Sequence, residues 1–301
     1  MNTSPPTPDW IAVDWGTSNL RVWSMQGSAM LQEAQSADGM GALERDGFEP
    51  VLSALIAPFS LPAGRPIIAC GMVGSRQGWV EAPYRTVPST PLGVDFTVTE
   101  CGTHPVHIIS GLRQNTPADV MRGEETQIAG FLALNPGWEG VICLPGTHTK
   151  WAEVSAGEVI SFQTFMSGEM FALLSTQSVL RHSVTSDGWD ADAFLMAVND
   201  SMSKPERLAA RLFSLRAGDL LDGADAATAR AQLSGLLIGA ELAAARPYWL
   251  GRQIAIIGAA AQSDVYATAL KAQGVPATVT DAQRMTLAGL TAAYRLLKEN
   301  A

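Results

Sequence analysis

The sequence lacks the signatures of several common classes of protein. It contains no GxxxxGK[ST] loop, and the glycine-containing run after Ile257 does not follow the GxGxxG pattern. The P-loop and dinucleotide-binding Rossmann folds are therefore not expected. Lysine and arginine form no cluster, and the formal net charge is −9, from 20 basic and 29 acidic residues. Nucleic acid is consequently not an expected partner, because its binding requires a basic surface.

Membrane insertion and disulfide bonding are also not expected. No apolar run reaches the roughly 18 residues of a membrane helix, and residues 1–9 are polar and proline-rich, unlike a signal peptide. The three cysteines, Cys70, Cys101 and Cys143, are far apart, which is typical of buried thiols in a reducing compartment. We predict a cytoplasmic protein without a membrane partner, and the sequence predicts no oligomeric state.

What the chain does contain indicates a globular α/β protein. Of its 301 residues 47% are hydrophobic, and 28 glycines and 17 prolines are spread throughout. This length allows two domains. We expect one at residues 1–137 and one at 138–301, with the last helix crossing back to the first.

Hydrophobic periodicity predicts the elements of these domains. Strands are expected at residues 10–13, 20–24, 29–35, 66–70, 106–110, 140–144, 151–154, 159–165, 254–257 and 277–279. Helices are expected at residues 48–59, 122–134, 190–201, 205–215, 224–245 and 282–298, with others starting at residue 167 and ending near residue 271.

The turn between the first two strands carries an acid, a glycine and two hydroxyls. These are Asp14, Gly16, Thr17 and Ser18. Glycine lets backbone N–H groups approach a bound anion, and the carboxylate could hold a divalent cation that bridges phosphates. An ordinary hairpin with a polar turn is the alternative for this stretch alone.

A similar strand–turn–strand unit occurs in the second half. There the turn contains Gly146, Thr147, His148, Thr149 and Lys150. The two turns suggest an internal duplication. A later strand runs into a third glycine-containing segment, with Gly258, Ala259 and Ala260.

These parts, in this order, resemble the sugar kinase, heat-shock-protein-70 and actin superfamily. The two turns match its phosphate 1 and phosphate 2 segments, residues 122–130 match connect 1, residues 254–263 match the adenosine segment, and residues 287–294 match connect 2. The resemblance implies an α/β, two-lobed actin-like (ribonuclease H-like) ATPase fold, with a mixed sheet and flanking helices in each lobe. ATP and Mg²⁺ would bind in the cleft, with Asp14 near the metal. The phosphates and adenosine would contact Gly16, Thr17, Ser18, Gly146, Thr147, Thr149, Lys150, Gly258, Ala259 and Ala260.

Longer blocks resemble one family within it, the 2-dehydro-3-deoxygalactonokinases. They are residues 71–79 (GMVGSRQGW), 81–84 (EAPY), 122–127 (RGEETQ), 144–151 (LPGTHTKW) and 165–169 (FMSGE). The resemblance implies ATP-dependent phosphorylation of the terminal hydroxyl of 2-dehydro-3-deoxy-D-galactonate. Arg76 is our first candidate for the substrate carboxylate, because guanidinium binds carboxylates bidentately. Arg122 and Arg85 are the alternatives, and Ser75, Gln77 and Glu169 are candidates for the substrate hydroxyls.

The catalytic base is expected at the start of the helix after Gly123. Superfamily members place an Asp there, whereas this chain has Glu124 and Glu125. We favour Glu124, since it follows the glycine directly. A helix N-terminus lowers the pKa of a carboxylate, which suits an ionised base. Glu125 remains the alternative.

Two other functions remain open. One is a different sugar or sugar-acid kinase of the same superfamily. The other is a nucleotide-switched clamp like actin or the chaperone ATPases. Dependence of ATP consumption on an added sugar acid would distinguish a kinase from a clamp.

Overall fold

The computed structural model describes residues 7–300, and they form two compact units. The first unit holds the chain up to Trp138 together with Val154–Ser161 and the segment that begins at Ala282. The second holds Glu139–Glu153 and Phe162–Asp281. Most of the segment 1–9, for which no signal peptide is expected, lies outside the described residues. Within residues 7–300, no helix combines the length and apolarity needed to cross a membrane.

A six-stranded mixed sheet forms the centre of the first unit. Its order is β3-β2-β1-β4-β7-β6, with β1 antiparallel to β2 and parallel to β4, and β4 parallel to β7. The parallel pairing brings the carboxyl end of β1, at Asp14, beside the end of β4, at Cys70. The strands are Trp10–Trp15 (β1), Leu20–Gln26 (β2), Ala29–Ser36 (β3), Ile67–Gly71 (β4), Thr97–Cys101 (β6) and His104–Ile108 (β7).

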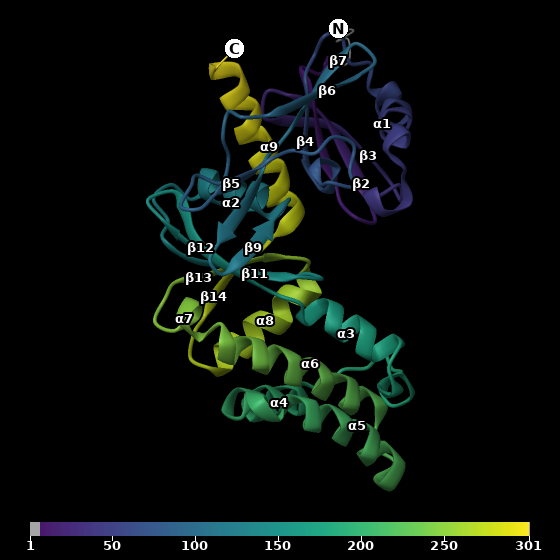
Figure 1. Ribbon diagram of the computed structural model, residues 1–301, viewed down its shortest axis with the longest axis vertical. Helices are drawn as coiled ribbons and strands as arrows, with labels where there is room; N and C mark the ends of the chain where they lie inside the picture. The colour runs from purple at the N-terminus through teal and green to yellow at the C-terminus, as the bar shows by residue number, and fades with distance from the viewer. Residues whose placement is uncertain (1–6, 301) are drawn as a thin grey trace, which may run out of the picture. The chain divides into compact units, whose positions relative to one another are not determined.

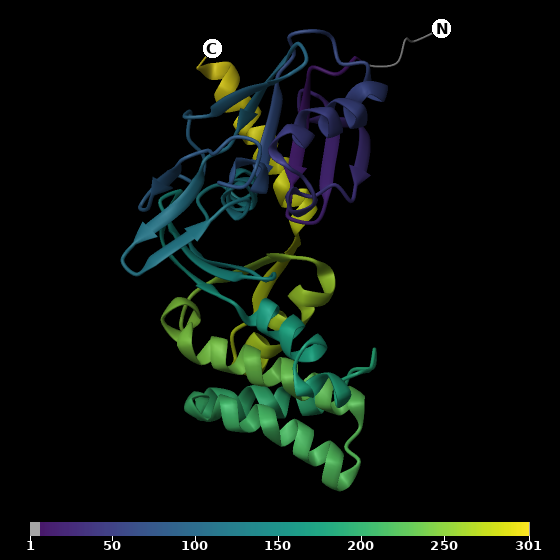
Figure 2. The same ribbon diagram turned by 45° about the vertical axis from the view of Figure 1, so that its right-hand side comes forward.

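Alternate residues of β1 enter two different cores, one on each face of this sheet. Ile11, Val13 and Trp15 pack with helix α1 (Phe48–Ile56), whereas Trp10 and Ala12 pack with helix α9 (Ala282–Glu299). This follows from the period of two in a strand. Both views of the ribbon show α9 running along this unit (Figures 1 and 2).

Helix α2 (Glu124–Leu134) crosses α9 with the two backbones in contact. A Cβ atom on Gly289 would lie 1.9 Å from the Thr126 carbonyl oxygen, and one on Gly130 would lie 1.9 Å from that of Met285. Any side chain at these two glycines would force the helices apart. The crossing therefore fixes the start of α2 in the first unit.

A small three-stranded sheet leads into α2. Its order is β5-β8-β9, from Tyr84–Thr86 (β5), Gly111–Asn115 (β8) and Ala118–Met121 (β9). Strand β9 ends directly before Arg122, so this sheet delivers the chain to the first turn of α2.

The second unit is built on a five-stranded sheet of order β12-β11-β10-β13-β14. Strands β10, β13 and β14 are parallel. The order matches that of β3-β2-β1-β4-β7 in the first unit, which supports the internal duplication predicted from the two turns. The strands are Gly140–Leu144 (β10), Thr149–Ser155 (β11), Glu158–Phe165 (β12), Ile254–Gly258 (β13) and Ala277–Asp281 (β14).

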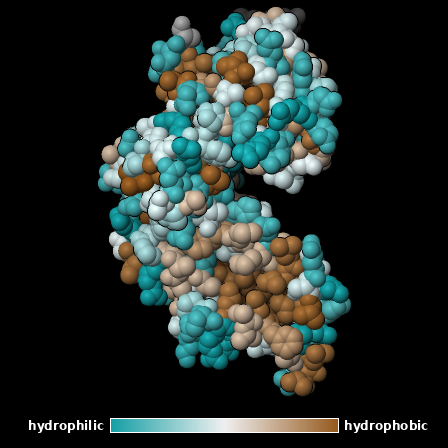
Figure 3. Space-filling view, in the orientation of Figure 1, coloured by the Kyte–Doolittle hydropathy of each residue, from teal (hydrophilic) through white to brown (hydrophobic). Residues whose placement is uncertain are grey.

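Helices make up the rest of the second unit. Val141 and Ile256 of the sheet share a core with Ile238 and Leu242 of α6 and with Leu270 of α8. Apolar residues gather on the surface where α3, α5 and α6 lie (Figure 3). The helices are Ser167–Thr176 (α3), Ala191–Ser203 (α4), Leu208–Asp222 (α5), Ala226–Ala244 (α6), Arg246–Trp249 (α7) and Ala260–Ala272 (α8).

Candidate active site

The first predicted turn, between β1 and β2, is held by a second loop. Met40 and Gly41 donate backbone hydrogen bonds to the carbonyl oxygens of Gly16 and Thr17, each at 2.9 Å. Thr17 and Ser18 themselves are exposed. The turn is thus anchored through its carbonyl groups and presents two hydroxyl side chains to solvent, as a phosphate-binding turn requires.

Asp14 lies at the carboxyl end of β1 in a polar corner. Its Oδ2 is 3.8 Å from Arg21 Nη2, and its Oδ1 accepts a hydrogen bond from Cys70 Sγ at 3.9 Å. Burial raises the pKa of Asp14, and Arg21 and the Cys70 hydrogen bond oppose that rise. A Cβ atom on Gly71 would lie 3.6 Å from Asp14 Oδ1, and one on Gly123 would lie 3.4 Å from Gly71 Cα. Asp14 therefore lies close to the residue that precedes α2.

The two glutamates at the start of α2 have different environments. Glu125 is fully buried and accepts hydrogen bonds from Gly123 N at 2.7 Å and Thr126 Oγ1 at 3.1 Å. Glu124 is partly exposed and accepts from Arg122 N at 3.0 Å. Both carboxylates accept backbone N–H groups of the two residues before the helix, and Glu124 is the one of the pair that is exposed to a ligand.

The predicted sugar-acid segment follows β4 as a tight loop. Ser75 is buried, and its hydroxyl has no hydrogen-bond partner within residues 7–300. The next two residues, Arg76 and Gln77, are exposed. The Arg76 side chain is 82% exposed and its Nε lies 3.6 Å from Glu81 Oε1. An exposed pair of this kind contributes little to stability, so Arg76 is available to a ligand.

Arg122, the second arginine candidate, makes contacts that stabilise the fold. It is 9% exposed, its Nη2 donates to the Ala82 carbonyl oxygen at 2.7 Å, and its guanidinium lies 4.2 Å from the Tyr84 ring centroid. A Cβ atom on Gly74 would lie 2.8 Å from its Nη1. Arg122 therefore ties the start of α2 to the segment after the sugar-acid loop.

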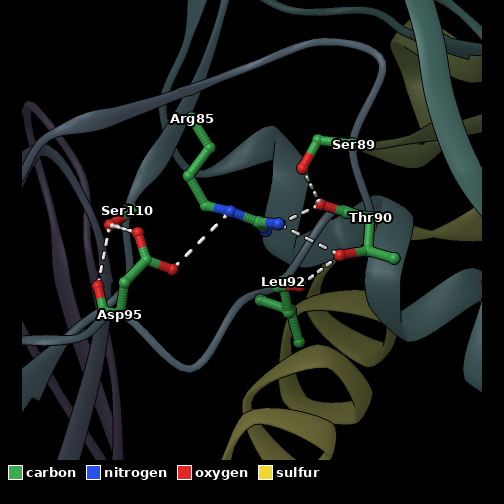
Figure 4. Close-up of polar contacts among 6 residues, drawn as sticks. All are labelled: Arg85, Ser89, Thr90, Leu92, Asp95 and Ser110. Atoms are coloured by element: carbon green, nitrogen blue, oxygen red, sulfur yellow. Dashed lines mark hydrogen bonds and ion pairs between the residues drawn. The ribbon is translucent and has the colours of Figure 1, made fainter.

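Arg85, the third arginine candidate, is engaged by its own loop (Figure 4). Its Nη1 donates to the Thr90 carbonyl oxygen at 2.8 Å, and its Nε lies 3.6 Å from Asp95 Oδ1. Asp95 in turn accepts from the Ser110 hydroxyl, at 3.1 Å through its carbonyl oxygen and 3.4 Å through Oδ2. These contacts fix the loop. Of the three arginines, Arg76 is the exposed one, whereas Arg122 has a buried Nη1 without a hydrogen-bond partner in residues 7–300.

The second predicted turn, between β10 and β11, points some of its residues outward and others inward. Gly146 and Thr147 are at the surface, whereas Thr149 and Lys150 are buried. The Lys150 Nζ donates to the His148 carbonyl oxygen at 3.1 Å, and the Thr149 hydroxyl bonds to Tyr266 Oη at 2.9 Å. The side chains of Thr149 and Lys150 thus hold the turn from behind.

Helix α3 supports this turn from its other side. Glu169 N donates to the Thr147 carbonyl oxygen at 2.9 Å, and the Glu169 carboxylate lies 2.7 Å from His148 Nε2. A Cβ atom on Gly168 would lie 2.1 Å from the Gly146 carbonyl oxygen. Glu169, predicted to bind substrate, is thus placed in the second unit as a partner of His148.

A pocket of about 490 Å³ opens beside the second turn, within the second unit. Gly146 of the predicted nucleotide-binding residues lines it, and Gly258, Ala259 and Ala260 directly precede a stretch that does. Its volume and mainly apolar lining suit a small organic ligand. The lining residues are Pro145, Gly146, Ser167, Gly168, Phe171, Trp189, Arg230, Ser234, Leu237, Ile238, Ala261, Gln262, Asp264, Val265 and Tyr266.

Much of this lining is absent from the sequence prediction. Phe171, Trp189, Arg230 and Ile238 come from helices or loops that carry no recognisable motif. Arg230 lies 5.0 Å from the Phe171 ring centroid, in cation–π contact. Only the three-dimensional packing of α3 and α6 brings these residues together, so no local signal identifies them.

The raised pKa values of two buried glutamates predict how the free energy of unfolding depends on pH. Burial raises the pKa of Glu125, with Glu124 adding to the rise, and burial raises the pKa of Glu241; each reaches about 7 from an ordinary 4.5. Because the folded protein binds these protons more tightly, their stabilisation is complete below pH 4.5 and is lost as the pH rises through 7. From pH 8 to pH 6 we expect a gain of about 1 kcal/mol per glutamate.

Urea denaturation at pH 6, 7 and 8 measures this dependence. Glu125→Gln should reduce its slope, since an amide does not titrate. His107, whose pKa burial lowers, opposes the gain at the acidic end. Equal stability at pH 6 and pH 8 would contradict the prediction.

Comparison with known proteins identifies the family. The family model for 2-keto-3-deoxy-galactonokinase matches residues 14–293. A curated 2-dehydro-3-deoxygalactonokinase of Escherichia coli is 33% identical over 94% of this chain and 97% of its own, and a relative of Rhizobium meliloti named "Probable 2-dehydro-3-deoxygalactonokinase" is 40% identical over 96% and 97%. A Sinorhizobium meliloti structure described as a protein of this kind has a TM-score of 0.88 at 40% identity, covering 95% of this chain and 96% of that one.

The comparisons confirm the predicted class of fold and enzyme. The fold is the mixed α/β fold of the actin-like ATPases and sugar kinases. A carbohydrate kinase, rather than a clamp, is what the relatives indicate. The chain belongs to the 2-keto-3-deoxy-galactonokinase family, a family of ATP-dependent carbohydrate kinases.

Proposed function

We propose that this protein transfers the γ-phosphoryl group of ATP to the terminal hydroxyl of 2-dehydro-3-deoxy-D-galactonate, giving the 6-phosphate in galactonate catabolism. The observation that carries the proposal is the match, over almost the full length of both chains, to two curated relatives named as a 2-dehydro-3-deoxygalactonokinase and a probable one. The three free cysteines, all buried, favour the reducing cytoplasm as its compartment.

We assign Glu124 to binding the hydroxyl of the substrate that accepts the phosphoryl group. It is the more exposed member of the glutamate pair, and it is the first residue of α2, directly after Gly123. An ionised carboxylate can orient the hydroxyl and take its proton as the phosphoryl group departs from ADP.

Asp14 is assigned to Mg²⁺. Its carboxylate is a hard oxygen donor, which suits this ion, and within residues 7–300 no group of three or more His, Cys, Asp or Glu residues could hold a metal. Mg²⁺ would therefore be held by one carboxylate and by nucleotide phosphates, its usual arrangement. When bound, it would neutralise charge on the phosphates.

The nucleotide is assigned to two sets of residues. Gly16, Thr17 and Ser18 of the first turn, and Gly146 and Thr147 of the second, would donate to phosphates. Thr149 and Lys150 support the second turn from behind. The pocket of the second unit would take the nucleoside. Its lining is mainly apolar and includes Gly146 of the turn and the residues directly after Gly258, Ala259 and Ala260.

Arg76 is assigned the substrate carboxylate, and Ser75 and Gln77 the neighbouring oxygens. Arg76 is exposed, whereas Arg85 is bound by its own loop and Arg122 donates through Nη2 to the Ala82 carbonyl oxygen. Arg122 is the alternative, because its buried Nη1 has no hydrogen-bond partner in residues 7–300. Glu169 lies against His148, so we assign it to orienting the second turn as well as to any contact with substrate.

A substrate panel tests the proposal. ADP release from ATP should be at least tenfold faster with 2-dehydro-3-deoxy-D-galactonate than with the gluconate epimer, and negligible with neutral hexoses. A tenfold preference corresponds to about 1.4 kcal/mol. Preference for a neutral sugar would assign another sugar kinase activity. ATP turnover independent of any acid would overturn the proposal entirely.

A further inference from the structure

A buried carboxylate lies behind the pocket of the second unit. Glu241 on α6 is 3% exposed, and its two oxygens accept different hydrogen bonds. Oε1 accepts from Trp151 Nε1 at 2.8 Å, and Oε2 accepts from Tyr266 Oη at 2.9 Å. None of the assignments made above uses this group.

The hydrogen bonds form a directed chain that reaches the second turn. The Trp151 indole can only donate, and an ionised Glu241 can only accept. When Glu241 is ionised, Tyr266 donates its single hydroxyl hydrogen to it, so Thr149 must donate to Tyr266 across their 2.9 Å contact. Glu241 therefore sets the direction of a bond made by a residue of the turn.

This chain joins strand β11 to three helices, α3, α6 and α8, that line the pocket. Trp151 and Thr149 belong to β11, Tyr266 to α8, and Glu241 to α6. Ser167, the first residue of α3, hydrogen-bonds to the same carboxylate and lines the pocket, as Tyr266 does. Burial raises the pKa of Glu241, and the bonds from Ser167, Trp151 and Tyr266 oppose that rise. A buried carboxyl group that is costly to ionise is thus kept at the point where these elements meet.

We propose that Glu241 is a positioning residue for the nucleotide, which holds the turn at Thr149 and the pocket wall at Tyr266 and Ser167 in one arrangement. The proposal rests on the proposed function, in which this pocket takes the nucleoside of ATP. Glu241 itself is too deeply buried to contact the ligand.

Glu241→Gln tests it with little change of volume. The amide keeps one acceptor but points an N–H₂ group at a second donor, so either Trp151 or Tyr266 loses its partner or the Tyr266–Thr149 bond reverses. We expect the KM and Kd for ATP to rise about tenfold, because a tenfold change in affinity corresponds to about the free energy of one hydrogen bond. The kcat and the KM for the sugar acid should stay within about twofold, since Arg76 and Glu124, which are assigned to the acid, belong to the first unit and Glu241 to the second.

Ser201→Ala is the matched control. Ser201 is also buried, and its hydroxyl donates to the Leu236 carbonyl oxygen of the same helix α6 at 2.7 Å, a bond that does not involve the turn. This variant should lower the melting temperature without changing the Kd for ATP. Tyr266→Phe removes the hydroxyl that bonds to both Thr149 and Glu241, but it leaves the bonds from Trp151 and Ser167 to Glu241. It should therefore raise the Kd less than Glu241→Gln does.

Three results would overturn the role of Glu241. The first is an unchanged Kd for ATP in Glu241→Gln. The second is a rise of this Kd in Ser201→Ala that equals the rise in Glu241→Gln. The third is an equal rise of the KM for ATP and the KM for the sugar acid in Glu241→Gln. If Glu241→Gln does not fold, an unchanged Kd in Tyr266→Phe overturns it instead. Failure of the proposed function is separate, because the unaltered protein would then bind no ATP or show no turnover with the acid.

Discussion

Glu124→Gln should lower kcat by about 10²–10⁴-fold, the usual contribution of a general base. The amide cannot take a proton from the accepting hydroxyl, but its carbonyl oxygen can still accept the bond from Arg122 N, two residues before it. The fold and the Kd for ATP should therefore stay unchanged. Steady-state kinetics and equilibrium ATP binding measure the two effects separately.

Glu125→Gln is the control for this prediction, since it changes the adjacent residue by the same atoms. Glu125 is fully buried, and a glutamine can still accept the bond from Gly123 N. We expect kcat to stay within tenfold of its normal value, because the buried group does not meet substrate. Full activity in Glu124→Gln together with a large loss in Glu125→Gln would transfer the base to Glu125.

The sequence predicts the fold best where a strand or helix has a buried face. In the first sheet, β1 and β2 alternate between the two cores, and α9 repeats its apolar residues at helical spacing. The β8–β9 hairpin has no such pattern. Val120 and the polar side chains of Arg113 and Gln114 give it little burial, so strand pairing rather than sequence pattern defines it.

Helix α5 shows a second limit of the sequence. The prediction ends it near residue 215, whereas the helix continues to Asp222 and ends at Gly223, which adopts a left-handed conformation. The last turns carry exposed Leu220 and Leu221, so they have no buried face that would extend the periodic pattern. A C-terminal glycine was the available signal for the true end.

The residues of the candidate site are likewise predictable only in part from the sequence. Its motifs can be recognised because glycines and acidic residues recur after strands. Which residues of a motif are buried cannot be recognised in this way. Glu124 and Glu125 are identical in type and adjacent, and only the 100° rotation between helical residues buries one and exposes the other. Trp189 and Arg230 belong to no motif, because folding alone brings their segments to the pocket.

Substitutions of Arg76 and Arg122 test which arginine binds the substrate carboxylate and which stabilises the fold. Arg76→Ala should raise the KM for the sugar acid by about 10–100-fold, the value of charge-assisted hydrogen bonds to a carboxylate. Its melting temperature and its KM for ATP should not change, because the side chain is 82% exposed and its pair with Glu81 is on the surface. Substrate kinetics and thermal unfolding of one preparation measure both.

Arg122→Ala should give the opposite result. It leaves the Ala82 carbonyl oxygen without its donor and removes the contact with the Tyr84 ring, a loss of about 2–4 kcal/mol of folding free energy. Arg122→Lys should not restore stability, since an ammonium group cannot both stack on the ring and reach the carbonyl. If instead Arg122→Ala were as stable as the unaltered protein and lost only affinity for the acid, Arg122 would be the carboxylate ligand. The exposed Arg76 would then be a surface residue.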